Sequence, residues 1–139
     1  MYCELLDILL VYGKENVYQW ADLDNSRITA DINEIIEFAI VDASEKIDAH
    51  FLGSGYEVPL ADADGETPEV VKRWCARLAG AILYKARGYE SEEDSVIKVE
   101  KQVYKDIADV LAGITRIKAV QKNYKKPMVG ILYDARTCE

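Results

Sequence analysis

Residues 31–52 carry the pattern that most constrains the fold. Apolar side chains recur there at steps of three and four, and charged side chains fill the other positions. The apolar set is Ile32, Ile35, Ile36, Ala39, Ile40, Ala43, Ile47 and Phe51. This spacing predicts a long α-helix with one apolar stripe, which other helices must cover. Gly53 and Gly55 mark its end.

Two later segments repeat the helical spacing. In residues 67–88 the stripe consists of Val71, Trp74, Cys75, Leu78, Ala79, Ile82 and Leu83. In residues 92–113 it consists of Val96, Val99, Val103, Ile107 and Val110, with Ile114 in line. Thr67 and Ser91 are expected to be N-caps, with Pro68 at a first helical position and Asp94 reaching back to the cap. Small residues around Gly80 should let another helix approach closely.

Two shorter apolar patterns precede these segments, at residues 3–12 and 14–21, with Gly13 between them. After residue 114 the helical period fades, and Pro127 prevents a helix from continuing. The sequence therefore predicts an all-α helical bundle of three long helices plus one or two short N-terminal helices. The bundle occupies residues 1–114, and an irregular C-terminal arm occupies residues 115–139.

The charge of the chain is unevenly distributed. The formal net charge is −8, yet residues 1–114 hold 11 Lys/Arg against 23 Asp/Glu, while residues 115–139 hold 6 against 2. An acidic body argues against general or sequence-specific nucleic-acid binding, which requires basic patches. No apolar run approaches the ~20 residues of a membrane span, and the N-terminus lacks the basic start of a secretory signal. Three widely spaced cysteines predict neither a disulfide framework nor a metal site, and indicate a reducing compartment.

Few side chains are candidates for chemistry. His50 is the only histidine, and it is expected to be a surface or loop-packing residue. Asp42, Glu45 and Asp48 lie three residues apart on the helix side opposite the apolar stripe, where solvated charges belong. Cys75 lies within an apolar stripe and is expected to be a core residue. We therefore predict no catalytic residues, no cofactor and no enzyme activity.

The stretch 22–33, "DLDNSRITADIN", resembles the start of a calcium-binding EF-hand loop. Counted from Asp22, the sixth position of such a loop requires Gly for a sharp turn, and the twelfth requires a bidentate Glu. Those positions hold Arg27 and Asn33. The sequence therefore favours a polar turn without bound metal, in which Thr29 or Asp31 caps the next helix.

Several ordered motifs resemble a known family. They are "MYCELLDILLVYG" at the start, "AIVDASEKIDAHFLGSGYEVPL" at 39–60 and "PEVVKRWCARLAGAILY" from 68. In order and spacing, residues 1–114 are similar to the small virion proteins of Mu-like phages and prophages. That family resembles the head–tail joining proteins (adaptors or connectors) of tailed phages. The resemblance implies a helical virion protein, made in the bacterial cytoplasm, without enzyme activity or cofactor.

The resemblance also implies partners. Head–tail joining proteins form a ring of identical subunits beneath the portal, in contact with portal and tail-side proteins. We expect the basic arm to make the decisive contact with an acidic neighbouring subunit. The candidate contact residues are Arg116, Lys118, Lys122, Lys125, Lys126, Ile131, Leu132 and Tyr133. The alternative is a free-standing helical regulator that binds a host or phage protein outside the virion.

Overall fold

The computed structural model describes residues 1–23, 25, 27–89 and 94–121. In that part of the chain it contains five helices and no β-strand. The helices are α1 (Leu5–Tyr12), α2 (Lys14–Ala21), α3 (Thr29–Phe51), α4 (Glu69–Ala86) and α5 (Ser95–Leu111). The predicted all-α bundle, with three long helices after two short ones, is therefore confirmed.

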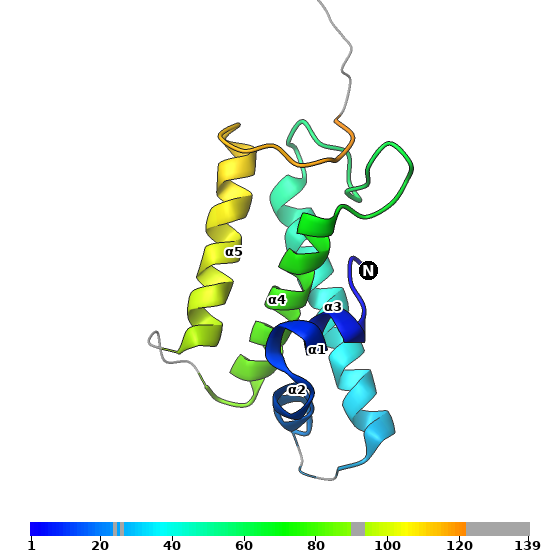
Figure 1. Ribbon diagram of the computed structural model, residues 1–139, viewed down its shortest axis with the longest axis vertical. Helices are drawn as coiled ribbons and strands as arrows, with labels where there is room; N and C mark the ends of the chain where they lie inside the picture. The colour runs from blue at the N-terminus through cyan, green and yellow to red at the C-terminus, as the bar shows by residue number, and fades with distance from the viewer. Residues whose placement is uncertain (24, 26, 90–93, 122–139) are drawn as a thin grey trace, which may run out of the picture.

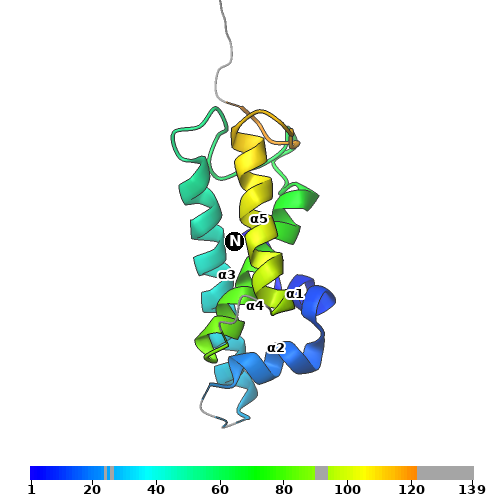
Figure 2. The same ribbon diagram turned by 90° about the vertical axis from the view of Figure 1, so that its left-hand side faces the viewer.

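The three long helices run in alternating directions (Figure 1), and α1 and α2 pack against α4, with α2 also in contact with α3. Figure 2 shows that α2 lies across the long helices rather than along them. Helix α4 occupies the centre, because it packs against each of the other four helices. The loops before α4 and after α5 therefore meet at one end of the bundle, while the loop before α3 lies at the other.

The core consists mainly of the apolar stripes that the sequence predicts. Every predicted residue on α3 is buried except Ile35, which is half-buried. Trp74 on α4 and Ile40 on α3 are each 2% exposed, in agreement with their places in the two predicted stripes. The Trp74 ring stacks on Phe51 with 6.2 Å between ring centroids, so the two helices share one aromatic contact.

Two apolar residues do not follow the predicted stripes. Ile114 is 75% exposed because α5 ends at Leu111 and the chain turns away at Gly113. Leu6 on α1 is 62% exposed, because this helix buries only the side that carries Ile8 against α4.

The predicted helix starts require correction. Pro68, rather than Thr67, is the N-cap of α4: its backbone is extended, and its carbonyl accepts the amide of Lys72 at 3.1 Å. Ile28 precedes α3, so neither Thr29 nor Asp31 is its cap. Asp94 is the N-cap of α5, and the predicted cap Ser91 lies outside the described residues.

Gly13 both ends α1 and starts α2. Its amide donates to the Leu9 carbonyl at 2.8 Å, and its own carbonyl accepts the Val17 amide at 3.1 Å. The backbone φ of 89° lies in the region that glycine adopts without a steric penalty. A glycine at this position therefore lets the chain change direction without a loop.

Candidate functional site

The loop between α2 and α3 contains the stretch that resembles an EF-hand calcium loop in sequence. The Asp22 carboxylate accepts the Arg27 amide at 3.1 Å, so it serves the turn itself. The Arg87 guanidinium donates to the Asp22 carbonyl at 2.5 Å and to the Asn25 side-chain oxygen at 3.0 Å. A protein cation therefore holds this loop through its first and fourth positions, by oxygens that an EF-hand loop does not use as metal ligands. Asp24 and Ser26 lie outside the described residues.

Across the part of the chain that the structure describes, no three His, Cys, Asp or Glu side chains are grouped to hold a metal ion. We predict that calcium at millimolar concentration leaves the melting temperature unchanged, because a ligand specific for the native state would raise it. The measurement is thermal unfolding with and without calcium. A clear rise at sub-millimolar calcium, lost in Asp24→Ala, would contradict this prediction.

Arg27 occupies the position at which an EF-hand loop has glycine, and it adopts a left-handed backbone with φ of 60°. This conformation costs a residue with a Cβ roughly 1–2 kcal/mol, and a glycine loses ~0.5–1 kcal/mol more chain entropy on folding. We predict that Arg27→Gly raises the free energy of unfolding by about 0.5–1 kcal/mol, measured by urea denaturation. Arg27→Ala keeps the strained backbone and is the control. Equal effects of both substitutions would show that the side chain, not the backbone, is responsible.

Most of the other side chains considered as candidates for chemistry take part in contacts within the fold. His50 is exposed, its Nδ1 lies 2.8 Å from the Lys46 carbonyl, and its ring faces Tyr104 on α5. Asp42 pairs with Lys46 at 3.3 Å, and Asp48 accepts a hydrogen bond from the Tyr2 hydroxyl. Glu45 is exposed on α3. The described residues thus bring together no acid–base pair within a pocket around His50.

One end of the bundle unites two segments that are far apart in sequence. After α5 the chain crosses this end and meets the loop between α3 and α4 (Figure 1). The Val120 amide donates to the Ala61 carbonyl at 2.8 Å, and the Glu57 amide donates to the Val120 carbonyl at 3.0 Å. Ile117 and Ala119 pack against the core. The first part of the predicted arm, residues 115–121, is therefore attached to the bundle.

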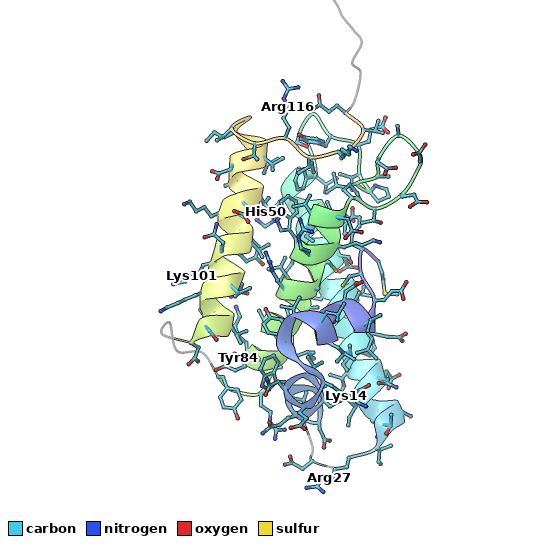
Figure 3. The ribbon with its side chains drawn as sticks, viewed as in Figure 1. Lys14, Arg27, His50, Tyr84, Lys101 and Arg116 are labelled. Carbon is cyan, nitrogen blue, oxygen red and sulfur yellow. The ribbon has the colours of Figure 1, made fainter. Side chains whose placement is uncertain are left out.

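The loop at this end is acidic, and the crossing segment is basic. Residues 57–66 include Glu57, Asp62, Asp64 and Glu66 and no Lys or Arg. A cavity of about 350 Å³ lies between Asp62–Asp64 and residues 117–120. Arg116 projects from this end, opposite the end that carries Arg27 (Figure 3). Both signs of charge therefore lie within one end of the molecule.

The structure describes two of the eight predicted contact residues. Arg116 and Lys118 are exposed at the end just described. The others lie outside the described residues: Lys122, Lys125, Lys126, Ile131, Leu132 and Tyr133. That the eight residues together form one partner contact remains a prediction.

A surface that the sequence analysis did not single out runs along α3, away from α4. We define the outer face of α3 as Glu34, Glu37, Phe38, Val41 and Glu45, all of them exposed. Phe38 is 68% exposed, which is unusual for an aromatic side chain at the middle of a long helix. None of its three carboxylates forms an ion pair with another described residue.

The sequence does contain a signal for this surface. Phe38 and Val41 interrupt the charged side of an otherwise regular amphipathic pattern, four residues after Glu34 and four before Glu45. An apolar pair between acidic residues suits a partner that is both apolar and basic.

A family model described as "Bacteriophage Mu, Gp36" matches residues 2–129. The match covers nearly the whole chain and extends past residue 114 into the arm. No curated protein matches the chain. None of the helices in the described ranges is long and apolar enough to cross a membrane.

Proposed function

The chain belongs to the bacteriophage Mu Gp36 family, and from this premise we propose that it is a non-enzymatic virion subunit that joins the phage head to the tail. In this role identical copies form a ring beneath the portal and contact portal and tail-side proteins. Family membership and the all-α fold support a phage structural protein. The observation that carries this proposal is that one subunit has two complementary segments. The outer face of α3 combines apolar and acidic side chains, and the sequence of the C-terminal arm combines apolar and basic side chains.

These two surfaces are complementary in chemistry. The outer face of α3 offers Phe38 and Val41 between carboxylates that have no ion-pair partner among the described residues. The arm beyond residue 121 offers Lys122, Lys125 and Lys126, followed by Ile131, Leu132 and Tyr133. Two different, complementary patches on one subunit produce a head-to-tail contact, which closes into a ring when the rotation permits.

The arm is long enough for this contact. The described chain ends at Gln121, which pairs with Tyr56 at one end of the bundle. A fully extended segment with the length of residues 122–139 spans up to ~60 Å. Helix α3, from Thr29 to Phe51, is ~35 Å long. The arm of one subunit can therefore extend along α3 of the next subunit, where Phe38 and Val41 provide the apolar anchor points.

The first experiment tests the function itself. Phage particles are purified from cells that express the chain, and the particles are examined for it by mass spectrometry. A joining subunit must co-purify with complete particles in a fixed copy number. A chain that is absent from particles and found bound to a host or phage protein in the cell extract would be the free-standing regulator instead.

The second experiment tests the arm. Truncation after Gln121 keeps the segment that pairs with Ala61 and Glu57, whereas truncation after Gly113 would also remove body contacts. We predict that truncation after Gln121 leaves the melting temperature unchanged and abolishes incorporation into particles. Incorporation should also weaken as salt rises, because charge attraction is screened over ~8 Å at physiological ionic strength. A truncated chain that still joins heads to tails would show that the arm is dispensable.

Charge exchange identifies where the arm binds. Reversal of Glu34, Glu37 and Glu45 to lysine should block assembly, and simultaneous reversal of Lys122, Lys125 and Lys126 to glutamate should restore it. Glu15→Lys on α2 is the control, since Glu15 is exposed and lies outside the outer face of α3. Assembly is measured as particle incorporation and as the mass of the purified protein in solution. If the variant with both charge reversals fails to assemble, or if the arm binds its own subunit, the proposed contact between the arm and α3 of the next subunit is wrong. Neither result would contradict the joining function.

A further inference from the structure

Two cysteines from distant parts of the sequence meet inside the bundle. Cys3 precedes α1 and Cys75 lies on α4, and their Sγ atoms are 3.0 Å apart. Both side chains are buried, with exposed fractions of 4% and 0%. A disulfide bond joins sulfurs about 2.05 Å apart, so a movement of ~1 Å separates this pair from a covalent link.

Hydrogen bonds hold the N-terminal segment in this position. The Tyr2 amide donates to the Ser44 Oγ at 3.1 Å. The Tyr2 hydroxyl donates to Asp48 and accepts the Leu60 amide at 2.7 Å. Burial and the Asp48 hydrogen bond raise the pKa of this hydroxyl, so it stays protonated and remains a donor. Cys3 is therefore fixed beside Cys75 by bonds on the residue before it.

The surroundings favour reaction at this pair. Cys3 is one of the residues that line two cavities, of about 250 and 310 Å³. The Sγ of Cys75 lies 3.4 Å from the Ser44 hydroxyl. Hydrogen bonding from Cys3 and then from Ser44 lowers the pKa of Cys75, against the effect of burial. The Cys3 thiol donates a hydrogen bond to Cys75, so Cys75 is the sulfur that loses its proton more readily.

We propose that Cys3 and Cys75 form a reversible intramolecular disulfide, with a peroxide as oxidant, when the protein leaves the reducing cytosol. The sulfur of Cys75, as the thiolate, attacks hydrogen peroxide. The oxygen–oxygen bond breaks, Cys75 becomes a sulfenic acid, and the departing hydroxide takes the proton that Cys75 gave up to become water. The sulfur of Cys3 then attacks the sulfenic sulfur of Cys75, and a second water leaves as the Cys3 thiol proton joins the departing hydroxide. Two thiols and one peroxide thus yield one disulfide and two waters.

The link would tie the N-terminus to the central helix and enclose α1, α2 and α3 in one covalent loop. Such a loop restricts the unfolded chain, so the oxidised protein should unfold at a higher temperature. From the usual range for disulfides, the melting temperature should rise by roughly 5–15 °C. A particle protein that stays in place after release from the cell would gain durability in this way.

The test uses the purified full chain, treated with hydrogen peroxide and compared with the fully reduced protein. Thiols counted after denaturation should fall from three to one. Peptide mapping should identify a Cys3–Cys75 link in a monomer, and a reductant should reverse both the link and the rise in melting temperature. Cys138→Ser should behave like the unaltered chain, whereas Cys3→Ala should show no rise. Three remaining thiols, or a link that involves Cys138, would overturn the proposal.

Discussion

Replacement of Trp74 by alanine is expected to lower the free energy of unfolding by about 3–5 kcal/mol. Trp74 is 2% exposed in the N-terminal half of α4, and its ring stacks on Phe51 of α3. Alanine would leave a cavity between the two helices, which share the largest interface of the bundle. Chemical denaturation of the purified protein measures the change.

Phe38→Ala is the matched control for Trp74→Ala. It removes an aromatic side chain from a long helix, but Phe38 is 68% exposed. Its effect on stability should stay within about 0.5 kcal/mol. A change at Trp74 as small as that at Phe38 would show that the stripe of α4 does not form the core. If Phe38 contacts a neighbouring subunit, its loss should instead weaken assembly.

Replacement of Gly80 by alanine is expected to destabilise the fold by roughly 1–3 kcal/mol. A Cβ at this position would lie 2.0 Å from Cε2 of Tyr12, so the Tyr12 ring would have to move. Movement would cost the 2.8 Å hydrogen bond from the Tyr12 hydroxyl to the Arg77 carbonyl and the edge contact with Trp20. The helix propensity of alanine offsets about 1 kcal/mol of these losses.

Two variants separate crowding from any general effect of losing a glycine. Gly55→Ala should be nearly neutral, because no atom lies within 4 Å of the added Cβ. In a Tyr12→Ala background, Gly80→Ala should lose its cost, because the ring that it displaces is absent. Thermal and urea unfolding of the unaltered chain, Gly80→Ala, Tyr12→Ala and the double variant gives the coupling energy between the two positions. A cost that persists without the Tyr12 ring would contradict the proposed contact.

The sequence by itself determined the helices and their buried sides. Periodic apolar residues place α3, α4 and α5 within two or three residues of their predicted bounds, because side-chain spacing along a helix is a local property. The same spacing identified Trp74, Ile40 and Cys75 as core residues. It was less successful at helix ends, where the cap depends on the local backbone and Pro68 replaced the expected Thr67.

Only the tertiary structure decided which distant residues meet. Tyr12 fills the space over Gly80, Cys3 reaches Cys75, and residues 115–121 pair with the loop before α4. The same packing leaves Phe38 and Val41 uncovered between carboxylates that form no ion pair with another described residue. These relations depend on how the helices are placed around α4, and a one-dimensional pattern does not record that placement. Periodicity thus determines that a face is apolar or acidic, and the arrangement in space determines what lies against it.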